Sequence, residues 1–259
     1  MMEAMEQIRV ALRQQFLSDR LLGVTSVPVT MPPPSASRGR RVAAPRAVDA
    51  AANAERLRVL DETQVKGCRK CGLCETRTQT VFGQGSPAAR IVFVGEAPGF
   101  EEDKQGLAFV GPAGQLLTRM IAAMGLTRDD VFICNVLKCR PPGNRDPLAD
   151  EILSCSPYLR EQLSVIQPEL IVALGAPAAK TLLNTTLSIG KLRGQFHEFY
   201  LSGVTGDGPY IPVLPTYHPA YLLRSPEEKG KSWADLQMAM DRLGLAPPQG
   251  NPGASSGKA

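Results

Sequence analysis

The chain has 259 residues, of which 43% are hydrophobic and 21% are charged. This usage is ordinary for globular proteins, so most of the chain should fold around a hydrophobic core. No window approaches the roughly 18 apolar residues that a membrane-spanning helix needs, and the N-terminus lacks the basic start and apolar stretch of a signal peptide. We therefore expect a cytoplasmic protein that has no contact with a membrane.

The formal net charge of +4 is unevenly distributed along the chain. Residues 61–245 contain 19 Lys and Arg against 20 Asp and Glu, whereas residues 1–60 contain 9 against 5. The part of the chain with the strongest secondary-structure signals is thus nearly neutral. Any contact that it makes with nucleic acid must depend on a local basic patch rather than on bulk charge.

The first sixty residues are predicted to lie outside the main domain. Residues 3–22 have the apolar spacing of a moderately amphipathic helix, which is a candidate docking element for a protein partner. Residues 27–46 are rich in proline and arginine and cannot bury enough apolar surface to repay ordering, so we interpret them as a flexible tether rather than a DNA-binding arm. The predicted organisation is helix plus linker (1–60), one main domain (61–245) and a disordered tail (246–259).

Within the main domain, short apolar strands alternate with helical patterns. Strands that are apolar on both faces and alternate with helices indicate a parallel sheet covered by helices. The predicted fold is α/β, a three-layer α/β/α sandwich around a central, mainly parallel four-stranded sheet, and ligands bind such folds at the carboxyl ends of the strands. The expected strands are 91–95, 131–136, 170–174 and 211–215, the expected helices 115–124, 147–166, 177–183 and 232–243, and an irregular or hairpin stretch covers 187–210.

Three of these strand ends carry residues that can do chemistry. The first is followed by the string Gly95–Gly99, which is neither a dinucleotide-binding fingerprint nor a Walker motif, so a nucleotide cofactor is disfavoured. Asn135 ends the second strand, where an amide can read the edge of a nucleobase or simply cap a loop. His218 follows the fourth strand, a position that favours function, whereas His197 lies in an alternating aromatic run and is interpreted as packing or surface.

The cysteines form a second group of candidate functional residues. Cys68 and Cys71 are a C-x2-C pair, Cys139 and Cys155 follow later in the chain, and Cys74 is a rival fourth ligand by spacing. Without an export signal, metal or cluster ligation is a better interpretation than disulfide bonds. Four thiolates suit zinc or an iron–sulfur cluster, and their spacing alone does not distinguish the two.

Taken together, these motifs resemble those of the iron–sulfur uracil-DNA glycosylases, the fourth family of that superfamily. The resemblance runs in unbroken order from about residue 64 to residue 243, and the combination of motifs is highly specific. The matching strings are Cys68-x2-Cys71, Gly95–Gly99 with Glu101-Glu-Asp103, Phe109-Val-Gly-x-Ala-Gly114, Asn135-x-x-Lys-Cys-Arg-Pro-Pro142, Cys155 and His218-Pro-x-Tyr-Leu-Leu-Arg224.

The resemblance implies a monofunctional DNA repair hydrolase that flips uracil out of DNA, releases it and leaves an abasic site. We accordingly expect a monomer whose partner is uracil-containing DNA. The implied cofactor is a [4Fe–4S] cluster, with zinc as the less favoured occupant, and Cys74 and Cys134 match no ligand of the family. The implied ligands are Cys68, Cys71, Cys139 and Cys155.

The resemblance also implies roles in a base pocket. Phe109 is expected to stack on uracil, Asn135 to bind its Watson–Crick edge, and the backbone near Glu96 and Ala97 to contact the base. His218 is expected to face O2, where a neutral imidazole would donate to the negative charge that develops as the glycosidic bond breaks. By the same resemblance, Leu222, Leu223 and Arg224 would press into the duplex. We further expect the cluster, through Cys139, to hold Lys138 and Arg140 beside the DNA backbone.

Two further roles concern water and thymine. Ala97 stands where the best-known branch of the superfamily has the aspartate that activates water. Glu96 is therefore our candidate for positioning the water, with ordering of the pocket as its alternative role. Gly99 cannot block the 5-methyl group of thymine, and the resemblance points to Glu102 for that exclusion.

Two other functions are compatible with the sequence. A non-catalytic nucleic-acid-binding module with a structural zinc or cluster would bind normal and uracil-containing DNA alike and release no base. A glycosylase of the same fold could act on another deaminated or mismatched base, although Asn135 and the Glu-Ala-Pro string favour uracil. A zinc hydrolase is disfavoured, because no histidine or carboxylate lies near the cysteines in a catalytic ligand pattern.

Overall fold

The structure, a computed structural model, describes residues 49–246. The predicted N-terminal helix, the linker and all but the first residue of the predicted tail lie outside the described residues. Within residues 49–246, no helix is long and apolar enough to cross a membrane. Among the described residues, the first helix is α2 (Ala50–Leu60). It precedes the predicted domain boundary at residue 61 and belongs to the domain, because its Leu57 and Leu60 are buried against the core.

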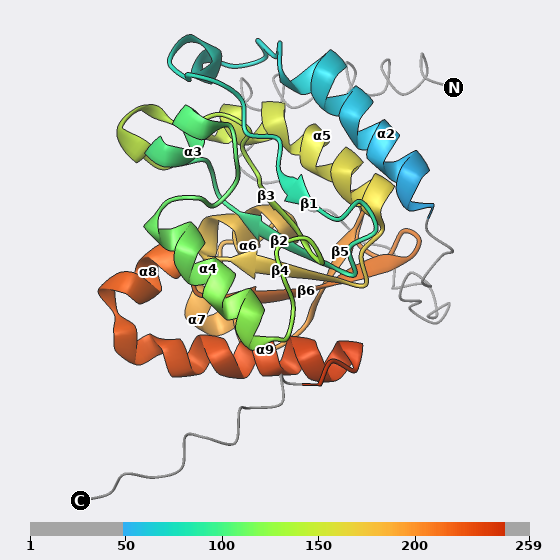
Figure 1. Ribbon diagram of the computed structural model, residues 1–259, viewed down its shortest axis with the longest axis vertical. Coiled ribbons are helices and arrows are strands. Elements are labelled where there is room, and N and C mark those ends of the chain that lie inside the picture. The colour runs from blue at the N-terminus through green and yellow to red at the C-terminus, as the bar shows by residue number, and fades with distance from the viewer. Residues whose placement is uncertain (1–48, 247–259) are drawn as a thin grey trace, which may run out of the picture. The chain divides into compact units, whose positions relative to one another are not determined.

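A six-stranded sheet forms the centre of the described part (Figure 1). Its order is β1-β3-β2-β4-β6-β5, in which the four inner strands are parallel and the two edge strands pair antiparallel with their neighbours. The strands are β1 (Gln84–Gly85), β2 (Ile91–Gly95), β3 (Phe132–Asn135), β4 (Leu170–Leu174), β5 (His197–Tyr200) and β6 (Tyr210–Thr216).

Helices connect the strands and cover both faces of the sheet. In Figure 1 the strands lie between α2 and α5 at the top and α9 at the bottom. The helices after α2 are α3 (Phe100–Gln105), α4 (Pro112–Ala123), α5 (Ala149–Ile166), α6 (Ala176–Leu183), α7 (Ile189–Leu192), α8 (Pro219–Arg224) and α9 (Lys229–Leu243). Shorter helical turns cover Asp61–Val65, Gly72–Glu75, Pro142–Asn144 and Pro226–Glu228.

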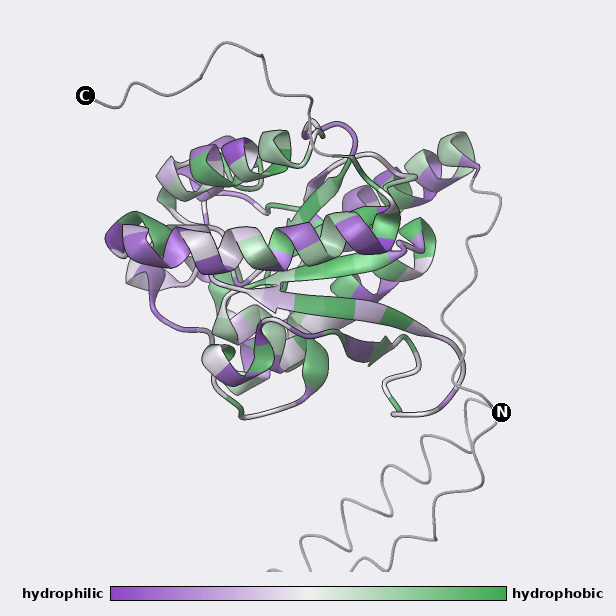
Figure 2. Cartoon of the chain, turned by 90° about the horizontal axis from the view of Figure 1, so that it is seen from below, coloured by the Kyte–Doolittle hydropathy of each residue, from purple (hydrophilic) through white to green (hydrophobic). Residues whose placement is uncertain are grey.

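Alternate residues of each inner strand pack on opposite faces of the sheet, as the two-residue period of a strand requires. In β2, Val92 and Val94 belong to the core that includes α2, α5 and α6, whereas Ile91 and Phe93 belong to the core under α4 and α9. Figure 2 shows the strands in the green of hydrophobic residues between helices that alternate green and purple. The three-layer α/β/α sandwich is thus confirmed.

The four inner strands are the four that the sequence predicted. The sheet has six strands rather than four because β1 and β5 extend it at the two edges. His197 begins β5, and its Nε2 lies 2.9 Å from the carbonyl oxygen of Leu192, which agrees with its interpretation as a packing residue. The parallel strands end on one side of the molecule, so the loops that follow β2, β3 and β6 come together there.

Candidate active site

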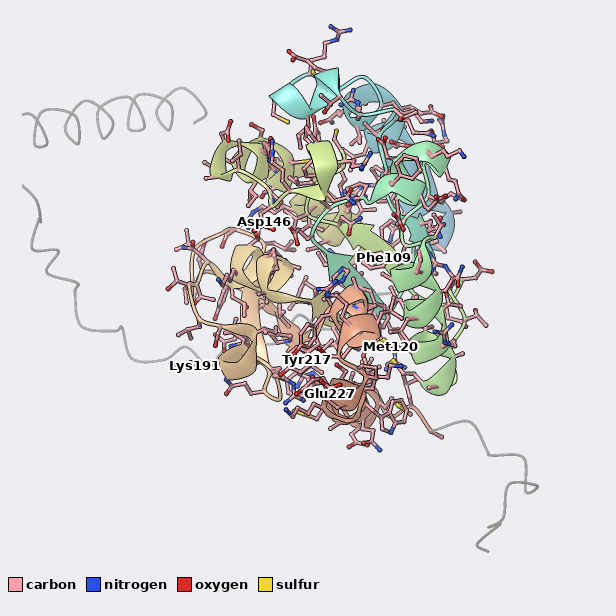
Figure 3. The ribbon with its side chains drawn as sticks, turned by 90° about the vertical axis from the view of Figure 1, so that its left-hand side faces the viewer. Phe109, Met120, Asp146, Lys191, Tyr217 and Glu227 are labelled. Atoms are coloured by element: carbon pink, nitrogen blue, oxygen red, sulfur yellow. The ribbon has the colours of Figure 1, made fainter. Side chains whose placement is uncertain are left out.

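A cavity of about 460 Å³ opens where β2, β3 and β6 end. Figure 3 looks onto this side of the molecule, with Asp146 and Phe109 labelled on two sides of the strand ends. A ligand site is expected at this edge of a parallel sheet. The predicted residues that line the cavity are Glu96, Ala97, Glu102, Phe109, Asn135, His218 and Arg224, and the others are Pro98, Gly99, Ala113, Asn144, Asp146, Ala220 and Tyr221.

Asn135 is the last residue of β3 and is almost completely buried. Its Oδ1 has no hydrogen-bond partner among the described residues, and an unsatisfied buried polar atom costs about 1–3 kcal/mol. Gly95 faces Asn135 in the sheet register. A Cβ at Gly95 would collide with Asn135 Oδ1 and lie 2.5 Å from Phe109 Cζ. The absence of a side chain at Gly95 therefore lets the amide and the aromatic ring line the same cavity.

The loop that carries Phe109 is held by two charged side chains. Phe109 has a left-handed backbone with a φ of 54°, which costs about 1–3 kcal/mol for a residue other than glycine. Glu102 accepts hydrogen bonds from the backbone N–H groups of Val110 and Gly111, both at 2.9 Å. Arg128 donates to the Phe109 carbonyl at 3.1 Å and to the preceding carbonyl at 2.6 Å. Glu102 thus orders this loop as well as lining the cavity.

His218 directly precedes α8 and caps it. Its Nδ1 accepts a hydrogen bond from the backbone N–H of Ala220 at 3.1 Å. Because a backbone N–H can only donate, Nδ1 is unprotonated and the neutral ring carries its proton on Nε2. Burial, with a further contribution from the positive charge of Arg224, lowers the pKa of His218 to about 4. The ring is therefore neutral at physiological pH and offers one N–H donor. The centroids of the His218 and Phe109 rings are 5.7 Å apart.

Glu96 and Asp146 form an acidic end of the cavity. Glu96 follows β2, and Asp146 lies in the loop after β3. Burial, followed by the negative charge of Asp146, raises the pKa of Glu96 to about 6. A carboxyl group with this pKa is mostly ionised at neutral pH yet close to the range in which it can accept and return a proton.

Lys138 is wrong as a DNA contact, because the side chain lies in the interior and is only 1% exposed. Its Nζ donates to the Asn135 carbonyl at 2.8 Å and to Gln162 Oε1 at 2.6 Å. Burial lowers the pKa of this amine. Lys138 therefore supports the strand end that carries Asn135 instead of reaching a phosphate.

Leu222 is likewise wrong as a residue that presses into the duplex. It is 1% exposed and fastens α8 to the core. The next residue, Leu223, is 41% exposed, and Arg224 lines the cavity. Arg140 is half-buried, and its Nε donates to Asn144 Oδ1 at 2.7 Å. The surface positions of Leu223, Arg224 and Arg140 leave them available for DNA.

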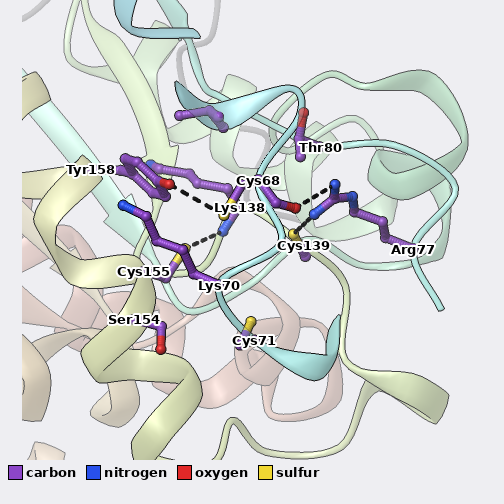
Figure 4. Close-up of a pocket in the computed structure, with 11 residues that line it drawn as sticks. Cys68, Lys70, Cys71, Arg77, Thr80, Lys138, Cys139, Ser154, Cys155 and Tyr158 are labelled. Carbon is purple, nitrogen blue, oxygen red and sulfur yellow. Dashed lines mark hydrogen bonds between the residues drawn. The ribbon is translucent and has the colours of Figure 1, made fainter. Parts of the chain in front are cut away.

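The predicted ligand cysteines line a second pocket, shown in Figure 4. Two come from the segment after α2, one from the loop after β3 and one from α5. Cys74 and Cys134 are not among the lining residues of this pocket. The lining cysteines are Cys68, Cys71, Cys139 and Cys155.

Three of these four sulfur atoms accept hydrogen bonds, which Figure 4 draws as dashed lines. Donors and positive charges beside a sulfur stabilise its thiolate form. The pairs are Arg77 Nη1 to Cys139 Sγ at 3.1 Å, the Tyr158 hydroxyl to Cys68 Sγ at 3.2 Å, and the Lys138 backbone N–H to Cys155 Sγ at 3.2 Å.

Burial is the largest influence on the proton affinity of three of the four thiols, those of Cys71, Cys139 and Cys155. It raises the pKa of Cys139 to about 11 and also raises the pKa values of Cys71 and Cys155. Metal binding would have to displace these protons. No group of three or more His, Cys, Asp or Glu within residues 49–246 is placed to hold a single metal ion. Four thiols around one pocket fit a cluster whose cysteines bind different iron atoms.

Several residues of the site were missed from the sequence. Asn144 and Asp146 lie in the loop after β3, and their place beyond a strand end was the available signal. Tyr221 lies within the matching string that begins at His218, but no role was drawn for it. Arg128 had no signal, because nothing in its sequence position indicates that it reaches the Phe109 loop.

Comparison with known proteins shows the family to which the chain belongs. The sequence profile of the Uracil DNA glycosylase superfamily matches residues 82–237. A type-4 uracil-DNA glycosylase of Saccharolobus solfataricus is 45% identical over 71% of this chain and 85% of its own length. A protein of the same name from Sulfurisphaera tokodaii is 49% identical over 63% of this chain and 74% of its own length. Another, from Thermotoga maritima, is 46% identical over 66% of this chain and 85% of its own length.

The α/β/α fold, the cavity at its strand ends and the profile match define the class: the chain belongs to the uracil-DNA glycosylase superfamily. Within that superfamily it belongs with the type-4 uracil-DNA glycosylases, since relatives of that type are more than 40% identical over most of both chains.

Proposed function

We propose that this chain hydrolyses the N-glycosidic bond of uracil in DNA, releasing free uracil and leaving an abasic site. The observation that carries the proposal is the buried Asn135 Oδ1, which lacks a partner among the described residues and lies in a cavity beside an aromatic ring. The N3–H of uracil would satisfy this oxygen, and the amide nitrogen can donate to O4. Cytosine presents an acceptor at N3 and a donor at C4, so it mismatches at both positions.

The target base must leave the stack, at a cost of about a few kcal/mol, before any group can reach its sugar. Stacking on the Phe109 ring and hydrogen bonding to Asn135 repay this cost inside the cavity. As the bond between C1′ and N1 breaks, electrons move onto the uracil ring and negative charge grows at O2. His218 donates its Nε2 proton in a hydrogen bond to O2, which stabilises the departing anion without proton transfer.

Water then attacks the electron-poor C1′. The ionised Glu96 carboxylate orients this water and accepts its proton, and its negative charge stabilises the positive sugar. Because water itself attacks C1′, no covalent bond to the protein forms. Glu102 keeps the pocket narrow by holding the Phe109 loop, and exclusion of the 5-methyl group of thymine depends on that loop.

The cofactor in this proposal is a [4Fe–4S] cluster held by Cys68, Cys71, Cys139 and Cys155. Base release requires no electron transfer, so the cluster has no redox role in the reaction. When bound, it would link three segments of the chain rigidly. Arg77 provides positive charge beside the Cys139 thiolate. Chemical analysis for iron and acid-labile sulfide distinguishes this cluster from zinc. We further propose that the protein is a monomer and acts in the cytoplasm.

A direct test incubates the purified protein with a labelled oligonucleotide that carries one uracil, followed by alkali. Strands with thymine or hypoxanthine in the same position test the other bases, and His218→Ala, Asn135→Ala and Val204→Ala proteins serve as variants and control. We expect cleavage at uracil only, a loss of about 10²–10³ in kcat for His218→Ala, and no change for Val204→Ala. Binding without base release by a folded, iron-containing protein would overturn the proposal.

A further inference from the structure

Phe100 is a large aromatic residue next in sequence to the lining of the base cavity. It begins α3, directly after the cavity-lining Gly99, and is 57% exposed. Single exposed apolar residues are common on protein surfaces, so exposure alone carries little weight. Two further observations make Phe100 a candidate for binding DNA: it lies next to the cavity, and its ring contacts a positively charged side chain.

That partner is Arg140, from the loop after β3. The guanidinium carbon lies 5.1 Å from the centroid of the Phe100 ring, within the range of a cation–π contact. Arg140 is held by its hydrogen bond to Asn144, which lines the cavity. The segments that follow β2 and β3 are thus joined, beside two residues that line the cavity, by the contact of a planar cation with an aromatic ring.

A second set of exposed groups lies on another side of the cavity. Tyr221 and Arg224 of α8 line the cavity, and Leu223 is exposed beside them. Strand β4 separates β6, which leads to α8, from β2, which leads to Phe100. The two sets are therefore placed to meet the DNA on different sides of a nucleotide that occupies the cavity.

We infer that Phe100 and Arg140 form a stacking subsite for the nucleobase adjacent to the flipped uracil, with Arg140 also attracting the neighbouring phosphate. The inference rests on the proposed function. Every nucleobase has a π-face, so stacking on Phe100 tolerates any neighbouring base. The subsite contributes most with single-stranded DNA, where the adjacent base is not already committed to a duplex.

The first test compares kinetics on single-stranded DNA that contains uracil, using the full-length, iron-containing protein. We expect Phe100→Ala to raise KM about tenfold with little change in kcat, because stacking on one aromatic side chain is lost. Phe100→Trp should restore KM. The matched control is Val204→Ala, an exposed apolar residue in the turn between β5 and β6. Arg140→Lys, which keeps the charge but loses the planar group, should fall between wild type and Phe100→Ala.

The second test is a double-mutant cycle between protein and DNA. One oligonucleotide lacks the base on the 5′ side of uracil and another lacks the base on the 3′ side. For one of the two, the KM of wild type should rise and the further effect of Phe100→Ala should vanish. Additive effects on both sides, or a KM for Phe100→Ala within about twofold of wild type, would overturn the subsite.

The same assay separates this inference from the proposed function. Uracil release by wild type together with unaffected Phe100→Ala kinetics removes only the stacking subsite. An absence of uracil release by folded, iron-containing wild type removes the proposed function itself. Thermal unfolding of each variant verifies that a change in activity does not come from unfolded protein. We expect the Phe100 variants to stay folded, because this side chain is exposed.

Discussion

At the scale of single residues, the cavity contains two groups whose proton affinities have been moved in opposite directions. Burial lowers the pKa of His218 to about 4 and raises that of Glu96 to about 6. Such a separation assigns a neutral donor and an ionised carboxylate to one site near neutral pH. The two side chains can therefore serve the leaving base and the attacking water at the same time.

The pH dependence of kcat/KM follows from Glu96. A carboxyl with a raised pKa is protonated as pH falls through about 6, so activity should decrease by about tenfold per pH unit below that point. Above it, the profile should be flat through neutral pH, because His218 is already neutral. In Glu96→Gln the rate should be lower and the decrease near pH 6 absent. A Glu96→Gln protein that keeps the wild-type profile would show that another group titrates.

A second prediction concerns Gly95. The Cβ of Gly95→Ala would displace the Asn135 amide and the Phe109 ring, and misplacing groups by about 1 Å can cost on the order of 10² in rate. We expect kcat/KM for uracil release to fall by about that factor. Gly190→Ala is the matched control, since a Cβ there meets no atom within 4 Å. Equal activities of the two variants would contradict the close approach at Gly95.

At the scale of elements, strands with a strong local signal were predictable, whereas short elements that depend on their surroundings were not. The four inner strands were predictable because their apolar runs are bounded by glycine and proline. The short helices α3 and α8 were not, since each has six residues and is held by groups such as Glu102 and His218 that cap it. The edge strand β1 has two residues, which is too short for any periodic signal.

The site shows the same division between local and long-range information. Asn135 and His218 were found because each follows an apolar strand. Lys138 was misplaced because its basic neighbours suggested a surface patch, whereas Gln162 of α5 and the carbonyl at the end of β3 satisfy its amine inside the fold. Those partners are distant in sequence or belong to the backbone, so no motif indicates them.

The hydrogen bonds from Arg128 to the loop that carries Phe109 provide a prediction at this scale. Arg128→Met removes the donors to the carbonyls at the left-handed Phe109 turn, and hydrogen bonds from a charged group contribute about 1.5–3 kcal/mol each. We expect KM for uracil-containing DNA to rise about tenfold while kcat falls less. Arg119→Met, an exposed neighbour on α4, is the control.

The mechanism of that effect can be checked in a Phe109→Ala background. If Arg128 acts by placing the ring, its substitution should have no further effect on KM once the ring is gone. Independent, additive effects would mean that Arg128 supports the protein in some other way.

At the scale of the whole molecule, the four-cysteine pocket joins three parts of the chain that are distant in sequence. Its cysteines come from the segment after α2, the loop after β3 and α5. A link also runs from this pocket to the base cavity. The backbone N–H of Lys138 donates to Cys155, and the amine of the same residue donates to the Asn135 carbonyl. Loss of the proposed cluster should therefore affect both stability and the base pocket.

Cys68→Ser tests this connection. We expect the variant to lose iron and acid-labile sulfide and to unfold about 10 °C lower, because metal-binding free energy is folding free energy and about 1 kcal/mol shifts the midpoint by about 2–4 °C at this size. At a temperature where circular dichroism shows the variant folded, KM for uracil-containing DNA should also rise. Cys74→Ser, which changes a cysteine outside the pocket, should keep iron, midpoint and KM. A Cys68→Ser protein that lost its iron yet kept its midpoint and KM would separate the cluster from both the fold and the site.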